Sequence, residues 1–329
     1  MKKISGLFFA VMLLTTFCFS CKQAVKVTKK TLNGPVFGSY YSIIYFSSSD
    51  MTPQIDSIFK AIDKSLSTYR NDSEIAIWNS GNDTINLSDN FIQIANLASK
   101  IHKESDGYFD PTVKTLVEGW GFGNGKPTNL LSDTEVTALM KSVGFDKLKI
   151  KERQILKENK EIQLDFNSIA PGFTSDVLAN FFLSKNIKNF MIDIGGEIVA
   201  HGQNTESKSF WRVGIDNPTK PNERDVVQAI SLENESLAVS GNYRKTKVDS
   251  LGNRIVHTVN PKTGYAQSSN LLSVTIVTDT CALADGYATS CMAMGVTKCK
   301  EFLTKNKKLK ALMIYEDDNE FIIEKINNF

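Results

Sequence analysis

The 329-residue sequence is poor in cysteine, and its five cysteines are unevenly placed. Cys18 and Cys21 lie close to the N-terminus, and only Cys281, Cys291 and Cys299 follow. These last three show no C-x-x-C spacing, so they indicate neither a zinc site nor a redox motif. Cys291 lies among methionine and alanine, which favours a buried core thiol.

The sequence also lacks an excess of charge of either sign. It has 38 basic and 36 acidic residues, and the first twenty residues hold two lysines and no acid, so 36 of each remain after them. This balance excludes the basic surface typical of nucleic-acid-binding proteins. The remaining ~300 residues are enough for one large domain or two intimate subdomains, each able to bury a core.

The apolar run near the N-terminus, Leu7 to Phe19, is too short to cross a bilayer with margin and follows Lys2 and Lys3. It ends in Ser20-Cys21, a small residue before cysteine, as in a bacterial lipobox. We therefore predict a signal peptide at 1–20, acylation of Cys21 and a polar tether at 21–33. The domain at 34–329 would be membrane-anchored and face the periplasm. Ordinary cleavage and an uncleaved anchor are the alternatives.

Strand-like and helical segments follow one another without a regular repeat. Val36–Phe46 is rich in tyrosine and isoleucine and predicts a strand, whereas the segment from Ser88 to about Glu104 has apolar residues at helical spacing. Short strand-like pieces fill much of the second half. This mixture predicts an α+β fold with largely antiparallel sheets rather than a regular βαβ array.

The segment Ala284–Ser290 carries the first candidate site. It follows the strand-like run Leu271–Val277 and begins a helix of small residues that we expect to reach about Met294. Asp285 and Thr289 are four residues apart, so they share one face of such a helix. A carboxylate and a hydroxyl suit Mg²⁺. The alternative is that Asp285 lies near the helix start and caps free N–H groups.

Three other features have a functional and a structural interpretation. The segment Gly119–Gly123 alternates aromatic residues with glycine and could receive a planar ring, or be a packed turn. Gly195-Gly196 could bring backbone N–H groups close to a phosphate, although a tight turn is the commoner case. His257 lies in an apolar strand, where a lone histidine usually has a structural role.

Taken together, these stretches resemble the FAD:protein FMN transferase family (ApbE, flavin transferase) over about residues 34–315. The matching blocks occur in the order of the family: Phe37-Gly38-Ser39, Ser67–Glu74, Gly107–Val113 with Trp120–Gly123, Leu164–Gly172, Ile194–Glu197, Ser240–Tyr243, His257–Gly264 and Ala284–Thr289.

The resemblance implies that FAD is the substrate and Mg²⁺ the cofactor. The family transfers the FMN half of FAD to a serine or threonine hydroxyl of an acceptor protein and releases AMP. Family acceptors are often subunits of membrane redox pumps, and members are often exported lipoproteins. By motif, FAD would be contacted by Phe37, Tyr69, Tyr108, Phe109, Asp110, Asp165 and Val259. The metal would be held by the Ser168 carbonyl, Asp285 and Thr289.

This sequence departs from the family pattern at three positions. Phe37 replaces a methionine, Pro171 stands where many members have a lysine that contacts FAD, and Ala288 stands where some have a second metal-binding aspartate.

Cleavage of a pyrophosphate requires its charge to be neutralised, which Mg²⁺ and the Gly195 and Gly196 amides could do. His257 is a candidate base for the acceptor hydroxyl, or it could position a phosphate or the acceptor. Two other functions are open: a Mg²⁺-dependent FAD pyrophosphatase that yields FMN and AMP, and a flavin-binding lipoprotein without turnover.

Overall fold

The protein is built on an eight-stranded sheet with strand order β1-β2-β5-β6-β9-β12-β13-β14. The computed structural model describes residues 26–123, 131–220, 225–242, 246–248, 254–266, 269–318 and 320–329. All neighbours in the sheet pair antiparallel. The strands of the sheet are β1 (Thr28–Val36), β2 (Ser39–Ser47), β5 (Phe190–Ile194), β6 (Glu197–His201), β9 (Glu235–Gly241), β12 (Leu271–Thr278), β13 (Lys310–Asp317) and β14 (Glu320–Ile326). The predicted α+β class is confirmed.

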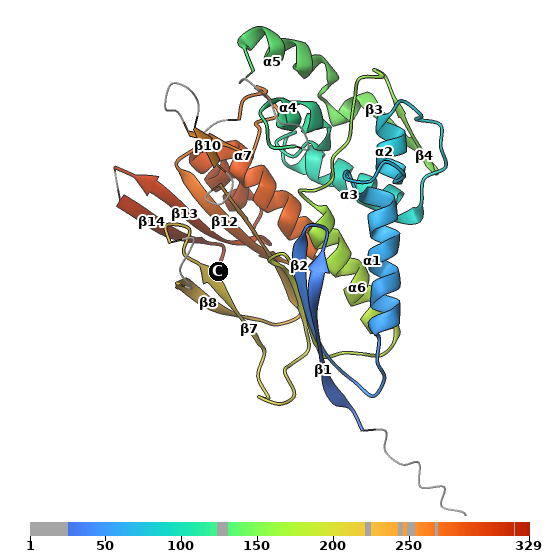
Figure 1. Cartoon of the computed structure of the whole chain (residues 1–329). Helices are drawn as coiled ribbons and strands as arrows, with labels where there is room; N and C mark the ends of the chain where they lie inside the picture. The colour runs from blue at the N-terminus through green and yellow to red at the C-terminus, as the bar shows by residue number, and fades with distance from the viewer. Residues whose placement is uncertain are drawn as a thin grey trace, which may run out of the picture.

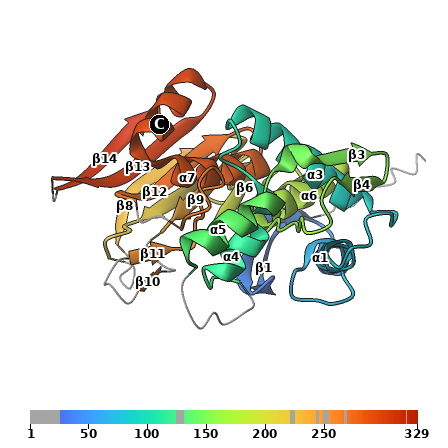
Figure 2. The ribbon, with the colours of Figure 1, turned by 90° about the horizontal axis from the view of Figure 1, so that it is seen from above.

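Helices cover one face of this sheet and a hairpin covers part of the other. The helices are α1 (Thr52–Leu66), α2 (Glu74–Asn79), α3 (Asp89–Glu104), α4 (Lys114–Gly119), α5 (Asp133–Leu139), α6 (Ala170–Ser184) and α7 (Cys281–Lys305). Figures 1 and 2 show β14 at one end of the molecule and α1 at the other, with α6 and α7 between them. The hairpin of β7 (Trp211–Asp216) and β8 (Val226–Leu232) packs through Trp211 and Leu232 on Phe46 and Leu237.

The short elements complete the chain. They are the 3₁₀ helices η1 (Pro111–Val113), η2 (Met140–Ser142) and η3 (Phe145–Lys147), the hairpin β3 (Leu148–Lys151) and β4 (Gln154–Lys157), and the pair β10 (Thr246–Val248) and β11 (Arg254–Val256). Within the part of the chain that the structure describes, no helix is both long and apolar enough to cross a membrane.

Strand β1 corrects the predicted tether. The polar stretch 21–33 was expected to remain outside the domain, yet Thr28 to Asn33 pair with β2 from Ser47 to Ser42. Alternate residues of β1 are half-buried, and Leu32 packs against the core, so a mostly polar sequence is held by strand pairing. Residues 1–25, with the predicted signal peptide and Cys21, lie outside the described residues.

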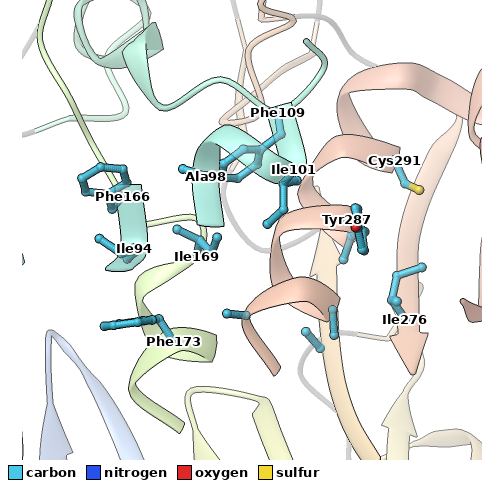
Figure 3. Packing of buried hydrophobic residues seen from close by; sticks show 14 of the residues in the cluster. Ile94, Ala98, Ile101, Phe109, Phe166, Ile169, Phe173, Ile276, Tyr287 and Cys291 are labelled. Atoms are coloured by element: carbon cyan, nitrogen blue, oxygen red, sulfur yellow. The ribbon is translucent and has the colours of Figure 1, made fainter. Parts of the chain in front are cut away.

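The main core lies where α3, α6 and α7 meet. Figure 3 shows Ile94, Ala98 and Ile101 of α3 facing Phe173 of α6 and Tyr287 of α7. Ile94, Ala98 and Ile101 are fully buried. Gly286 makes this contact possible, because a Cβ atom at its position would lie 2.5 Å from Ile101 Cδ1. The small-residue composition of α7 therefore allows close helix packing.

Helices α6 and α7 cap each other. Asp176 on α6 accepts hydrogen bonds from the backbone N–H groups of Cys281 (2.8 Å) and Ala282 (2.9 Å), at the start of α7. In return, Asp285 on α7 accepts one from the N–H of Gly172 (3.2 Å), in the first turn of α6. Each carboxylate thus satisfies amides at the positive end of the other helix.

Helix α7 is longer than predicted. It begins at Cys281 rather than Ala284 and continues to Lys305, with a break at Gly295 (φ 75°, ψ 176°). Asp285 therefore lies in the second turn and does not cap its own helix. The expected end near Met294 coincides with the break, after which the chain resumes a helical course.

Candidate functional site

The predicted metal-binding residues come together where α6 and α7 begin. The Thr289 hydroxyl donates to the Ser168 carbonyl oxygen (3.3 Å), and it lies 3.4 Å from Ser240 Oγ at the end of β9. Asp285 lies one turn before Thr289 and bonds to Gly172 in the segment that follows Ser168. We call Ser168, Asp285 and Thr289 the oxygen set. It joins a carboxylate, a carbonyl and a hydroxyl from segments more than 100 residues apart.

The carboxylate of Asp285 lies in a strongly desolvating environment. Asp285 is 6% exposed. Burial and the nearby negative charge of Glu197 raise the pKa of its carboxyl group well above the usual range, and the hydrogen bond from Gly172 N–H opposes this shift. A cation beside such a carboxylate would stabilise its ionised form.

The oxygen set fits Mg²⁺ in its donor chemistry. It offers only hard oxygen atoms, and a single carboxylate supplemented by neutral oxygens is typical of Mg²⁺ sites that share the ion with substrate phosphates. Across the described residues, no cluster of three or more histidine, cysteine, aspartate or glutamate side chains could hold a metal. The hard oxygen donors of the oxygen set suit Mg²⁺ better than a softer transition metal.

The structure explains two of the departures from the family pattern. Pro171 lies in the first turn of α6, where the missing N–H group costs nothing and the fixed φ favours helix initiation. Ala288 is completely buried in the apolar core. A carboxylate at position 288 would have to leave that core or be balanced by a cation.

Hydrogen bonds join two further blocks of the family pattern to the loop that contains Ser168. The Asn167 side-chain amide donates to Thr68 Oγ1 (3.3 Å), which brings the turn with Tyr69 next to the loop before α6. The N–H of Asp165 donates to the Pro111 carbonyl (2.9 Å), which attaches the block 107–113 to the same loop. Two of the predicted FAD blocks, 67–74 and 107–113, thus adjoin the loop before α6.

Three predicted FAD residues present part of their surface to solvent there. Tyr69 is 72% exposed in the turn after α1. Phe37 is half-buried in the turn between β1 and β2, with a φ of 49° and an edge-to-face contact with Phe59 (5.9 Å). Asp165 accepts a bond from the Asn167 N–H (2.8 Å), and burial raises its pKa.

Tyr108 lies among cations rather than in an apolar slot. Lys298 Nζ donates to its hydroxyl (2.5 Å), and the ammonium groups of Lys298 and Lys262 lie 5.1 and 5.6 Å from its ring centre. Lys262 Nζ is also 3.5 Å from the carboxylate of Asp106. The ring is 8% exposed and lies within cation–π distance of both lysines.

Three other predicted FAD residues have largely buried side chains, and their role towards FAD stays a prediction. Phe109 is 1% exposed in the main core, and Val259 packs in a smaller cluster with Trp120. The carboxylate of Asp110 accepts bonds from Thr112 N (2.8 Å) and Phe145 N (3.0 Å), and burial raises its pKa. In this conformation these side chains hold the loop 106–113 and the segment around Val259 in place.

Gly195 and Gly196 form a tight turn between β5 and β6. Both have positive φ values, 71° and 113°. The N–H of Gly195 donates to the Tyr40 carbonyl (3.0 Å), and that of Gly196 to Asp193 Oδ1 (2.9 Å). Both amides have partners within the protein, as in a tight turn, and their donation to a phosphate stays a prediction.

His257 follows β11 and lies edge-to-face with Phe122, at 6.3 Å between ring centres. The next residue, Thr258, donates from its hydroxyl to Asn242 Oδ1 (2.9 Å). Asn242 is 4% exposed and follows Ser240 by two residues, and Ser240 touches Thr289. This path connects the predicted base to the oxygen set.

Two cavities lie near these blocks. The larger, about 750 Å³, is lined by residues of α3, the loop 106–110, the segment 140–150 and Lys262. It includes Asp110 but none of the oxygen set. The smaller, about 280 Å³, is lined by Thr258, Asn260, Ser269, Asn270 and residues 292–295.

Comparison with known proteins identifies the family. The sequence model of the ApbE family matches residues 37–313. The FAD:protein FMN transferase of Haemophilus influenzae is 33% identical, covering 100% of this chain and 97% of the relative, and that of Vibrio cholerae is 31% identical over 88% of each. The chain belongs to the ApbE family.

Solved structures of ApbE proteins agree with the fold. The flavin transferase ApbE of Vibrio cholerae superposes with a TM-score of 0.82 at 29% identity, covering 92% of this chain and 99% of that one. The apo form of the flavinyl transferase ApbE of Pseudomonas stutzeri superposes with a TM-score of 0.83 at 27% identity. The match covers 92% of this chain and 96% of that one.

In this ApbE protein, several residues at the site had no predicted role. Ser240 and Asn242 belong to a block that the sequence comparison singled out without a function, and that block was the available signal. Asp176 and Lys298 had no such signal, because only the packing of α6 on α7 and of the loop 106–110 on α7 brings them to the site.

Proposed function

We propose that this protein transfers the FMN half of FAD to a serine or threonine hydroxyl of an acceptor protein and releases AMP, with Mg²⁺ bound at the oxygen set. The observation that carries the proposal is the convergence of Ser168, Asp285 and Thr289 with the blocks that contain Tyr69 and Asp165. The names of the curated relatives support the same activity.

The chemistry requires charge neutralisation at the pyrophosphate. Bound Mg²⁺ would supply this by withdrawing charge from the phosphate oxygens. Asp285, Thr289 and the Ser168 carbonyl would hold the ion, and Tyr69 and Phe37 would hold aromatic parts of FAD by stacking.

His257 serves as the base in this proposal. It takes the proton of the acceptor hydroxyl while that oxygen forms a bond to the phosphorus on the FMN side. The bond between this phosphorus and the bridging oxygen breaks, and the oxygen leaves with AMP. The path through Thr258, Asn242 and Ser240 fixes the position of the His257 segment relative to the oxygen set.

We also propose that the domain is tethered to a membrane through acylated Cys21 and faces the periplasm. The sequence pattern at 1–21 supports this proposal. A subunit of a membrane redox pump is then a suitable acceptor, because it would be held at the same surface.

The test uses purified protein, FAD and Mg²⁺, with and without a membrane fraction from cells that lack this gene. Transfer predicts a protein band with covalent flavin fluorescence and an equal amount of AMP. Release of free FMN and AMP without acceptor labelling would instead identify a pyrophosphatase, and retention of intact FAD would identify a binding protein.

A further inference from the structure

One end of the main sheet is rich in lysine. At this end β1, β5, β9 and β13 begin and β2, β6 and β12 end, as their pairing registers show. The segments next to these strand ends are 26–30, 48–50, 185–189, 202–209, 233–235, 279–280 and 305–310. They contain ten lysines, which we call the lysine-rich end: Lys26, Lys29, Lys30, Lys185, Lys188, Lys208, Lys305, Lys307, Lys308 and Lys310.

Hydrogen bonds and ion pairs hold these segments side by side. They join Lys29 Nζ to Glu206 Oε2 (2.9 Å), Phe46 N to the Asn189 carbonyl oxygen (3.1 Å), Gly202 N to Asn234 Oδ1 (2.8 Å) and Lys310 Nζ to Glu235 Oε1 (2.5 Å). The loop 202–209 thus contacts both β1 and the turn 233–235, and that turn contacts β13. Because the contacts run from one segment to the next, the lysines lie together at one end of the domain.

The charge of this end contrasts with that of the chain as a whole. The same segments contain five acidic residues: Asp50, Glu206, Glu233, Glu235 and Asp279. After residue 20 the chain has 36 residues of each sign, so the excess of five positive charges at this end is matched by an excess of acids elsewhere. Two apolar side chains, Val27 (60% exposed) and Leu183 (40% exposed), lie beside the lysines. Clustered lysines beside exposed apolar side chains suit an anionic membrane surface.

The predicted anchor and the proposed FAD site belong to opposite ends of the sheet. Strand β1 begins at the lysine-rich end, shortly after Cys21, and residues 22–25 between them contain Lys22 and no acid. Phe37 lies in the turn at the far end of β1, and Ser240, which contacts Thr289, lies near the far end of β9 (Figure 1). At about 3.3 Å per residue, the FAD site is about 17 Å from the lysine-rich end along β9 and about 30 Å along β1.

We propose that the lysine-rich end binds the anionic head groups of the membrane that holds the anchor at Cys21, with the FAD site directed away from the lipid. This inference rests on the proposed membrane tether and adds the orientation of the domain. Anionic lipids attract lysine side chains at a membrane surface, and the attraction decays over about 8 Å at physiological ionic strength. The contact is too weak to replace the anchor, but on an anchored domain it selects one orientation. An acceptor then has to present its hydroxyl on the side away from the lipid.

Chemical labelling of lysines tests this orientation. The purified full chain is reconstituted on vesicles of phosphatidylcholine, alone or with about 30% phosphatidylglycerol, and treated with acetic anhydride. Mass spectrometry then gives the acetylation of each lysine. The anchor should hold the protein on both kinds of vesicle. We expect Lys188, Lys307 and Lys308 to react at least about threefold more slowly on the anionic vesicles only, and this protection should disappear in about 0.5 M salt.

Charge reversal at the lysine-rich end provides a second measurement. The triple variant Lys188→Glu, Lys307→Glu and Lys308→Glu should lose the protection of Lys29 and Lys185, because repulsion replaces attraction. The matched control changes the net charge equally at exposed lysines of α3 and of the β3 and β4 region: Lys100→Glu, Lys151→Glu and Lys160→Glu. The control should keep the wild-type protection. Both variants should release AMP from FAD at the wild-type rate in detergent, since none of the six lysines belongs to the FAD site.

Equal acetylation on both kinds of vesicle, or protection of the three control lysines in place of the lysine-rich end, would overturn the contact and leave the anchor intact. Protection on native membranes without protection on anionic vesicles would also overturn it, because the partner would then be an acidic protein. Failure to associate with phosphatidylcholine vesicles would show that the anchor is absent and would overturn the proposal through its premise. FMN transfer is measured separately by the covalent flavin label and does not depend on any of these results.

Discussion

At the residue scale, Asp285 has two functions that can be separated by substitution. Its carboxylate accepts a bond from Gly172 N–H, and it is the only charged member of the oxygen set. An asparagine can still accept that bond through its side-chain oxygen, but it cannot neutralise a cation. The hydrogen bond to Gly172 therefore does not require the negative charge of Asp285, whereas metal binding does.

Asp285→Asn is expected to lower the rate of AMP release at least about 100-fold, since metal-based charge stabilisation contributes several kcal/mol. Thr289→Val removes a neutral oxygen that water can replace, so the rate of AMP release should fall by only about tenfold. Rates with FAD and Mg²⁺, together with thermal unfolding of each variant, measure both effects. Wild-type turnover in Asp285→Asn would contradict the assignment of the oxygen set.

Tyr69 is the predicted FAD residue that can be changed with least effect on the fold. Because it is 72% exposed, Tyr69→Ala should alter the free energy of unfolding by no more than about 0.5 kcal/mol. It should weaken FAD binding by about 1–3 kcal/mol through lost stacking. Fluorescence titration with FAD measures the affinity, with Tyr69→Phe as the conservative control. Equal affinities for wild type and Tyr69→Ala would remove this residue from the site.

At the element scale, the mutual capping of α6 and α7 sets the position of the oxygen set. Asp176 holds the start of α7, and Asp285 holds the start of α6. A shift of either helix would separate Thr289 from Ser168. The same contact bears on stability, because desolvation of the half-buried Asp176 raises its pKa to about 6.

The pKa of Asp176 predicts a dependence of stability on pH. The unfolded chain loses this proton near pH 4, whereas the folded protein retains it to about pH 6, so the folded state binds more protons in this range. The contribution of Asp176 to the free energy of unfolding therefore falls as pH rises from 4 to 6, by at most about 3 kcal/mol. In Asp176→Asn this fall in the free energy of unfolding between pH 4 and pH 6 should be absent. Denaturant unfolding of both proteins at several pH values measures it.

Asp56→Asn, on the exposed face of α1, is the control for that experiment. It should leave the pH profile of stability parallel to that of the wild type. If the free energy of unfolding has the same pH dependence in Asp176→Asn and in the wild type, the prediction is wrong. The Asp176 carboxylate would then be ionised across this range and stabilised by the N–H groups of Cys281 and Ala282.

At the scale of the whole molecule, the early start of β1 places the domain close to its predicted anchor. Only six residues separate Cys21 from Thr28, and they span at most roughly 25 Å when extended. A domain on so short a tether would work at the membrane surface.

Cys21→Ser should move the protein from the membrane fraction to the soluble fraction, because no acyl chain can then be attached. The purified variant should retain FAD-dependent AMP release, since β1 and the rest of the domain are unchanged. Fractionation followed by the activity assay tests both parts. Sedimentation of Cys21→Ser with membranes would contradict the anchor assignment, and loss of activity would indicate that the anchor has a further role.

Local patterns in the sequence determined much of the fold and the family. Helix α3 begins beside Ser88, where the predicted helical segment starts, and the Ser88 side chain caps it by accepting from Phe91 N. The strand Leu271–Thr278 and the face shared by Asp285 and Thr289 likewise follow from short-range periodicity. The resemblance to the ApbE family also follows from the sequence alone, because each matching block is a short run of residues and the blocks occur in the order of the family.

Only the tertiary structure shows which of the predicted site residues are buried and which of their polar groups already have partners. Phe109 and Val259 are as apolar in sequence as Phe37, and only packing shows that the first two are buried whereas Phe37 is half-buried. The Gly195 and Gly196 amides are engaged by Tyr40 and Asp193, which a dipeptide cannot reveal. Burial and long-range hydrogen bonds arise from contacts between distant segments, so local patterns do not contain them. For the same reason, the capping of α6 by Asp285 could be found only in the folded chain.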